Sequence, residues 1–149
     1  ERTAHLSTHS GQIAFPGGRV DESDADVTAA ALREAYEEVG LEYRYVDVLG
    51  TLPVYTTGTA FQVTPVVALV QPDFTLLPNA FEVADTFEVP LTFLMDPAHH
   101  QRHAFEWEGV RREWFSMPFH ETVAGEVRER FIWGATAGML RNFYRFLSA

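Results

Sequence analysis

Apolar and polar positions recur with the period of a helix over residues 23–40. The apolar positions, three or four residues apart on one face, are Leu32, Ala35 and Val39. Ser23 is a residue type that caps helix N-termini, and Asp26 stands three positions later as a capping-box partner. Gly40 then suits a left-handed C-cap. We therefore predict a helix that is capped at Ser23 and ends at Val39.

Runs of β-branched and aromatic residues predict strands along the rest of the chain. They are residues 11–15, 46–55, 61–70, 87–89, 103–107 and 111–115. Residues 56–59 read as a loop between two of these strands, and Glu108-Gly109 as the turn of a hairpin.

Two more helical segments are expected. Pro90 opens a helical turn that runs through Met95. Apolar residues at helical spacing predict a final helix over 131–147. Strands interleaved with two substantial helices indicate the α/β class, with a mixed sheet packed between helices.

Length and composition limit the classes of protein. With 149 residues, of which 46% are hydrophobic, the chain suits one globular domain over 1–149. No apolar run approaches the roughly 18 residues of a membrane span, and no cysteine is present to form disulfides or thiolate sites. These features favour a cytoplasmic protein without a membrane partner. Because the glycine turn follows so soon after Glu1, we expect a missing N-terminal strand upstream.

The net charge is −10, which argues against a nucleic-acid partner, since a phosphate backbone is bound by a basic surface. Such a charge also keeps a small protein in solution. An acidic protein that handles an anionic substrate would need cations to neutralise the contact.

Three acids near the end of the predicted helix indicate a metal site. Glu34, Glu37 and Glu38 lie three and four residues apart and project from one helix face. Like charges at this spacing cost a helix roughly 0.2–0.5 kcal/mol per pair. Mg²⁺ binds through a few carboxylates and completes its shell with water and substrate phosphate. The cluster therefore predicts a metal-dependent reaction on a phosphate compound.

This helix and the glycine turn before it resemble the Nudix box, Gly-x5-Glu-x7-Arg-Glu-apolar-x-Glu-Glu-x-Gly-apolar. The second half of the pattern matches at Arg33, Glu34, Ala35, Glu37, Glu38, Gly40 and Leu41. The first half has one extra residue between Gly18 and Arg33, and Asp24 replaces the isolated glutamate. The resemblance implies a Nudix fold, an α/β/α sandwich with a central mixed sheet.

The region before the box resembles bacterial coenzyme A diphosphatases, whose signature is Leu-Leu-Thr-x-Arg-[Ser/Ala]-x3-Arg-x3-Gly-x3-Phe-Pro-Gly-Gly. Arg2, Gly11 and the run 15–18 stand at its spacings, whereas Thr3 and Ser7 depart from it. Runs similar to the same group occupy residues 9–18, 63–67 and 133–137. The resemblance implies hydrolysis of coenzyme A or its thioesters to 3′,5′-adenosine bisphosphate and 4′-phosphopantetheine.

The family resemblance also implies roles for individual residues. The implied ligands of Mg²⁺ or Mn²⁺ are the Gly17 carbonyl, Glu34, Glu37 and Glu38. The candidate substrate contacts are Arg2, Gly18 and Arg19. Arg33 is expected to hold a glutamate through a bidentate contact, with an exposed pair to Glu37 as the alternative. The general base is either Glu34 or Glu82, which sequence alone does not separate.

Alternatives stay open at the level of function. ADP-ribose or an oxidised nucleotide could replace coenzyme A as the small-molecule diphosphate substrate. A Nudix-fold module that binds a nucleotide without cleaving it is the alternative from another class. A homodimer is expected by analogy with the family.

Other conspicuous residues favour ordinary structural roles. Three histidines could suggest a zinc site, but their spacing is more typical of a polar loop before a strand. They are His99, His100 and His103. The tryptophans expected in the core, with adenine stacking as the alternative for one, are Trp107, Trp114 and Trp133. Arg111 and Arg112 suit either phosphate contacts or plain surface.

Overall fold

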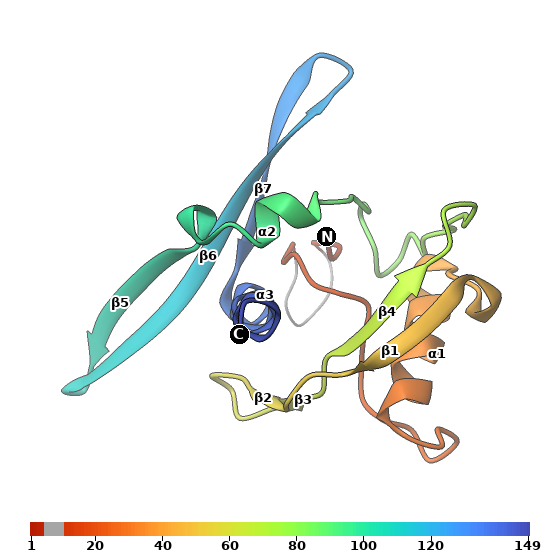
Figure 1. Cartoon of the computed structure of the whole chain (residues 1–149), viewed down its shortest axis with the longest axis horizontal. Helices are drawn as coiled ribbons and strands as arrows, with labels where there is room; N and C mark the ends of the chain where they lie inside the picture. Colours follow the sequence, from red (N-terminus) through yellow and green to blue (C-terminus); the bar gives the residue numbers. More distant parts are fainter. Residues whose placement is uncertain (5–10) are drawn as a thin grey trace. The chain divides into compact units, whose positions relative to one another are not determined.

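The computed structural model describes residues 1–4 and 11–149, which divide into two compact units, Glu1–Thr86 and Phe87–Ala149 (Figure 1). Ser7 and the start of the run 9–18 therefore lie outside the described residues. Each unit combines helices with antiparallel strands. That the whole chain forms one domain stays a prediction.

The first unit contains one long helix and two small strand pairs. Its elements are α1 (Val27–Val39), the 3-10 turn η1 (Tyr43–Tyr45), β1 (Val46–Thr51), β2 (Tyr55–Thr56), β3 (Gln62–Val63) and β4 (Val66–Val70). Strand β1 pairs with β4, and β2 pairs with β3, both antiparallel. The predicted strands 46–55 and 61–70 are thus present, but each is divided near a proline, Pro53 or Pro65, which has no N–H to donate to a ladder.

Helix α1 begins later than the sequence predicted. Its N-cap is Asp26, whose Oδ1 accepts a hydrogen bond of 2.8 Å from the N–H of Ala29. The prediction of Ser23 as the cap is wrong, because Ser23 bonds to Asp21 instead. The predicted C-cap is confirmed, since Gly40 is left-handed with a φ of 68°.

The predicted strand 11–15 is absent from the first unit. Its first residues instead bond to Arg2: the Arg2 N–H donates to the Gln12 carbonyl at 3.0 Å, and the Gly11 N–H donates to the Arg2 carbonyl at 3.0 Å. Arg2 also forms a bridge with Val83. The apolar run is therefore loop, held at its start by a short contact to residues near the chain's beginning.

The second unit is a three-stranded antiparallel sheet with a helix. Its elements are α2 (Leu91–Leu94), the 3-10 turn η2 (Pro97–His99), β5 (Gln101–Trp107), β6 (Val110–Val123), β7 (Glu126–Trp133) and α3 (Gly134–Leu147). The hairpin around Glu108-Gly109 is confirmed, and positive φ angles of 50° and 75° at these residues match the turn that suits right-handed strand twist. The predicted strand 87–89 is absent from the structure, whereas the turn after Pro90 is present as α2.

The start of the final helix was predicted too early. Residues 126–133 form β7, which pairs along its length with β6. Burial alternates there, with Arg130 and Ile132 buried and Phe131 and Trp133 exposed, which is the period of a strand. The long partner β6 therefore decides the structure where the sequence also permits a helix.

Each unit buries a small apolar core. The buried apolar residues are Ala30, Val39 and Leu52 in the first unit and Met117, Ile132, Ala137 and Leu140 in the second. The core prediction for two tryptophans is wrong, because Trp107 is 63% and Trp133 is 42% exposed. Trp114 is half-buried and stacks on His103 with a 4.0 Å separation of ring centroids.

The α/β class is confirmed. Within either unit the described strand pairs are antiparallel, so the parallel pairing of a mixed sheet is not among them. Within the described residues, no helix has the length and apolar character needed to cross a membrane.

Candidate active site

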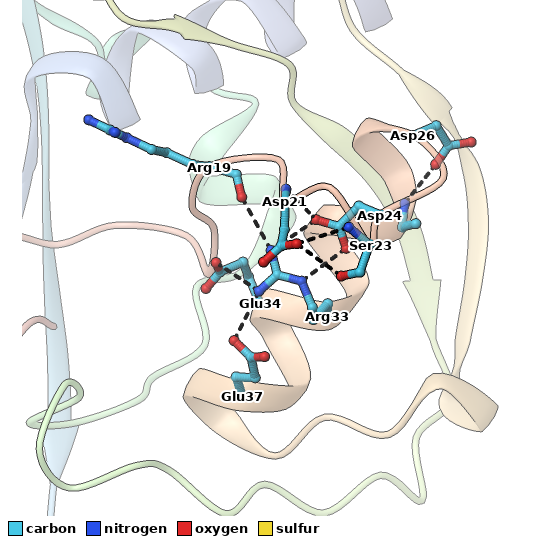
Figure 2. A network of polar contacts seen from close by, with 9 residues as sticks. Arg19, Asp21, Ser23, Asp24, Asp26, Arg33, Glu34 and Glu37 are labelled. Carbon is cyan, nitrogen blue, oxygen red and sulfur yellow. Dashed lines mark hydrogen bonds and ion pairs between the residues drawn. The ribbon is translucent and has the colours of Figure 1, made fainter.

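The site is built around Arg33, which projects from α1 onto the turn before it (Figure 2). Its Nε and Nη2 donate to the two carboxylate oxygens of Asp24 at 2.9 and 3.0 Å, a bidentate pair. The Asp24 side chain is only 4% exposed. The hydrogen bonds from Arg33 lower the pKa of Asp24, and the same contact raises the pKa of Arg33. Asp24 thus contacts the arginine of the box despite being shorter than the glutamate of the pattern.

The turn that contains Asp24 is closed by its own hydrogen bonds. The Asp21 N–H donates to Asp24 Oδ2 at 2.8 Å, and the Asp24 N–H donates to the Asp21 carbonyl at 3.0 Å. Asp21 Oδ1 accepts from the N–H and hydroxyl of Ser23, and these bonds lower the pKa of Asp21. The extra residue of the box is therefore accommodated in a compact turn that presents Asp24 to the helix.

Arg33 also reaches two of the predicted metal ligands. Its Nη1 donates to Glu34 Oε1 at 3.3 Å and to Glu37 Oε2 at 3.1 Å. The Glu34 side chain is 17% exposed, whereas that of Glu37 is 53% exposed. The bidentate partner of Arg33 is thus Asp24 and not a glutamate, whereas the pair with Glu37 is present as the alternative interpretation had it.

Gly18 lies against Glu34. A Cβ atom added to Gly18 would stand 2.4 Å from Glu34 Oε1, so the carboxylate would have to move from its observed position. The backbone of the glycine turn can approach this carboxylate because residue 18 has no side chain.

Arg19 contributes to the network through its main chain. Its carbonyl accepts a hydrogen bond of 3.2 Å from Arg33 Nη2, while its side chain extends away from the network (Figure 2). The Arg19 guanidinium instead lies over the Phe61 ring, 6.0 Å from its centroid.

A second group of charges meets at Glu38. The Gly17 N–H donates to its half-buried carboxylate, and Arg2 lies close enough to attract it. Burial is the main cause that raises the pKa of Glu38 to about 7, and repulsion from Glu34 and then from Glu82 adds to it. The structure therefore brings Glu82 and Arg2, which are distant in sequence, to the acidic face of α1.

These groups suit a divalent cation by their chemistry. The acids offer only oxygen donors, and the mutual repulsion of Glu34, Glu38 and Glu82 would be relieved by a positive charge among them. Residues 1–4 and 11–149 do not, however, hold three acidic or histidine side chains already gathered as a metal cluster. Which of the acids coordinate, and whether the Gly17 carbonyl joins them, stay predictions.

The histidines have other partners. His99 Nδ1 lies 2.9 Å from the Phe93 carbonyl, and His103 Nε2 lies 2.8 Å from Ser116 Oγ. His100 contacts the Leu94 carbonyl at 2.7 Å. The described residues hold no cluster of three metal-binding side chains. His99 ends η2 and His103 lies within β5, so the expected polar loop is in part a 3-10 turn.

Sequence reasoning missed two features of the site. One is Asp21, whose spacing of three residues from Asp24 is a usable signal for a turn closed by side chains. The other is the backbone of residues 77–83, which carries no motif but donates hydrogen bonds to carbonyls at the C-terminal end of α1. Arg111, in contrast, pairs with Glu113 on the hairpin at 3.5 Å and is exposed.

Comparison with known proteins agrees with this geometry. The NUDIX domain family matches residues 1–117, a range that extends across the boundary between the two units. A protein named uncharacterized Nudix hydrolase NudL from Escherichia coli O1:K1 is 40% identical over 143 residues, which are 95% of this chain and 70% of the relative. Its namesake from Citrobacter koseri is 42% identical over the same shares.

Nudix enzymes generally use divalent metal ions, in keeping with the acidic face of α1. The matched range contains the whole box and its turn. The extent of these matches establishes that the chain belongs to the Nudix family, as a pyrophosphohydrolase that acts on a small-molecule diphosphate.

Proposed function

We propose that the substrate is coenzyme A or one of its thioesters, hydrolysed at the diphosphate to 3′,5′-adenosine bisphosphate and 4′-phosphopantetheine. The observation that carries the proposal is the position of Arg2 beside both the signature loop and Glu38. Arg2 and Gly11 stand at the spacings of the coenzyme A signature, and their backbones are hydrogen-bonded to each other. These contacts support a signature that acts at the same site as the box.

The Arg2 side chain is suited to an anionic substrate. Its Nε is buried, and it has no hydrogen-bond partner among the described residues. A buried N–H of this kind gains most from a partner that carries negative charge. A phosphate oxygen bound next to the metal carboxylates would supply that partner, which supports Arg2 as a substrate contact.

The metal site of the proposal consists of Glu34, Glu37, Glu38 and the Gly17 carbonyl, holding Mg²⁺ or Mn²⁺. A bound divalent cation would lower the pKa of the attacking water and neutralise charge on the leaving phosphate oxygen. Arg33 fixes the direction of Glu34 through its contact of 3.3 Å. Gly18 leaves room for that carboxylate.

Glu82 is our candidate for the general base. Glu34 is already restrained by its hydrogen bond from Arg33, which suits a fixed ligand better than a group that accepts a proton. Glu82 comes from a loop and faces the same acidic region without belonging to the helix. It would accept the proton that the attacking water gives up as the phosphorus–oxygen bond forms.

The test is product analysis with coenzyme A, acetyl-coenzyme A and ADP-ribose, each with Mg²⁺ or Mn²⁺. We expect 3′,5′-adenosine bisphosphate from coenzyme A and no comparable turnover of ADP-ribose. A Glu22→Gln variant removes an exposed acid of the turn before α1 and should keep the wild-type rate. It is the charge-matched control for Glu→Gln variants of the proposed site.

Brisk cleavage of ADP-ribose with no cleavage of coenzyme A would refute the substrate proposal while leaving the family intact. Absence of turnover for all three compounds at millimolar metal, together with measurable nucleotide binding, would favour a binding module.

The chain contains no cysteine, which suits the reducing cytoplasm in which we expect the reaction to occur.

A further inference from the structure

The segment 77–83 is bound to the C-terminal end of α1 by main-chain contacts. The Leu77 N–H donates to the Val39 carbonyl at 2.8 Å, and the Asn79 N–H donates to the Glu38 carbonyl at 2.7 Å. These carbonyls would otherwise lack partners at the helix end. The segment therefore completes the hydrogen bonding of the same residues that lie beside the acidic face.

Gly40 makes this approach possible. It is left-handed, and a Cβ there would lie 2.8–2.9 Å from Leu77 atoms, two of them main-chain. The close passage of the segment past the helix end thus requires glycine for its lack of a side chain and for its φ.

Beyond Leu77 the segment turns at Asn79. The Asn79 carbonyl accepts from the N–H groups of Glu82 at 3.0 Å and Val83 at 2.8 Å, and its side-chain oxygen accepts from the Phe81 N–H at 3.1 Å. The turn places Glu82 where its charge acts on Glu38. Its two largest apolar side chains contribute little burial, since Leu77 is 80% and Phe81 is 66% exposed.

Thr3 holds the other side of this turn. Its hydroxyl donates to the Phe81 carbonyl at 2.7 Å, and its N–H donates to the Glu82 carbonyl at 3.1 Å. Thr3 is buried, with 7% of its surface exposed. The two bonds hold the peptide groups on either side of the Glu82 Cα, so they restrain the backbone from which the Glu82 side chain projects.

We infer that Thr3 is a positioning residue, whose buried hydroxyl holds the Glu82 loop over the acidic face of α1. The inference rests on the proposed role of Glu82 in diphosphate hydrolysis. Thr3 itself does not touch substrate; it acts through the Phe81–Glu82 peptide. No motif of the sequence assigns this role, because Thr3 stands at a position where the coenzyme A signature has serine or alanine.

The test compares Thr3→Val, which keeps the shape and removes the hydroxyl, with Thr3→Ser, which keeps the hydroxyl. Hydrolysis of coenzyme A and of ADP-ribose is measured with Mn²⁺, and both kcat and KM are determined. We expect Thr3→Val to lower kcat roughly ten- to hundredfold with little change in KM, since displacement of a catalytic group mainly affects the chemical step. Thr3→Ser should stay within about twofold of wild type, and Thr51→Val is the matched control on β1.

A double-mutant cycle with Glu82→Gln distinguishes positioning from general destabilisation. If Thr3 acts through Glu82, Thr3→Val should lower kcat less than about twofold in the Glu82→Gln background. Equal losses in both backgrounds would overturn the inference. So would an unimpaired Glu82→Gln single variant, because no catalytic group would then be held.

Amide hydrogen exchange gives a second readout that does not depend on turnover. Thr3→Val should speed exchange of the Glu82 and Val83 amides on the order of tenfold, and Thr3→Ser should not. Unchanged exchange at these two amides would also overturn the inference. A wild-type chain that cleaved neither diphosphate would refute the proposed function, and the exchange comparison would still decide whether Thr3 holds the loop.

Discussion

Two regions hold helix α1, and they do so by different means. On one side the turn 21–24 is bound through charged side chains, chiefly the bidentate pair of Arg33 and Asp24. At the C-terminal end the segment 77–83 is bound through main-chain N–H groups that donate to helix carbonyls. The acids of the proposed site lie between these two attachments.

The difference explains what each attachment can do. A charged pair fixes the direction of side chains, and Arg33 extends that order to Glu34 and Glu37. Main-chain bonds instead fix a distant piece of chain, and here they bring Glu82 to Glu38. The first attachment therefore orients the proposed ligands, and the second adds a group that the helix does not contain.

The largest expected effect comes from the acids that both attachments serve. Glu37→Gln and Glu38→Gln should each lower kcat/KM roughly 10²–10⁴-fold, since each would remove a carboxylate from the proposed metal site. Far-UV circular dichroism should remain that of the wild type. A near-normal rate for either variant would remove that residue from the ligand set, and Glu42→Gln, at an exposed acid just beyond the helix, is the control.

Gly40→Ala tests the main-chain attachment. The new Cβ would meet the Leu77 backbone and would have to adopt a positive φ, so we expect segment 77–83 to leave the helix end. The strained conformation alone costs about 1–3 kcal/mol of the free energy of unfolding. Loss of the Glu82 position should lower kcat roughly 100-fold.

Gly58→Ala is the matched control for this substitution, because a Cβ at Gly58 would meet nothing within 4 Å. Urea unfolding and steady-state rates measured on both variants check the prediction. Equal behaviour of the two alanine variants would show that the close approach at Gly40 has no functional weight.

Asp24→Asn tests the side-chain attachment and should have a smaller effect. The amide keeps the shape but weakens the bidentate contact to Arg33, so the direction of Glu34 should become less fixed. Loss of such an orienting partner costs roughly 10- to 100-fold in activity or metal affinity. Mn²⁺ titration and rate measurements should show this loss, and Asp24→Glu should restore part of it; an unaltered Mn²⁺ affinity and rate would contradict the prediction.

The two attachments also differ in how far sequence could predict them. Arg33, Glu34, Glu37 and Glu38 form a pattern that identified the family, because side-chain chemistry requires particular residue types. The contact of residues 77–83 uses main-chain groups, which every residue type possesses. Gly40 is its only trace in the sequence, and the sequence explains that glycine equally well as a helix cap.

The errors in the fold have the same origin. Residues 131–133 carry apolar positions that also suit the predicted helix 131–147, and their strand structure depends on pairing with β6. The hairpin at Glu108-Gly109 and the helix end at Gly40 were predicted correctly, since local backbone conformation decides them. Long-range pairing is set by partners that a local pattern does not contain.

The pH dependence of stability tests the burial of Glu38 among like charges. Because the folded state raises the pKa of Glu38 from 4.5 to about 7, it binds this proton more tightly than the unfolded state does. In metal-free protein the contribution of Glu38 to the free energy of unfolding should therefore fall as pH rises from about 4.5 to about 7, and it should stay constant at higher pH. Glu38→Gln lacks this dependence. The urea midpoint of this variant should therefore rise relative to that of the wild type between pH 5 and pH 8.

The measurement is urea unfolding in the presence of a chelator, with Glu37→Gln as the comparison. Added Mn²⁺ should reverse the order at pH 8 and stabilise the wild type more than Glu38→Gln, since a cation favours the charged carboxylate. An advantage of Glu38→Gln that did not change with pH would contradict the burial of this carboxylate among like charges.

The smallest expected effect lies at the start of α1, within the side-chain attachment. Asp26 accepts from the Ala29 N–H, so Asp26→Ala should lower the free energy of unfolding by about 0.5–2 kcal/mol. Ser23 bonds to Asp21 outside the helix and is exposed, so Ser23→Ala should change it by less than about 0.5 kcal/mol. Asp26→Ala should not alter KM, because the Asp26 side chain bonds to the Ala29 N–H at the start of the helix. Urea unfolding of the two variants decides between them, and a larger loss for Ser23→Ala would return the cap to the residue that the sequence pattern favoured.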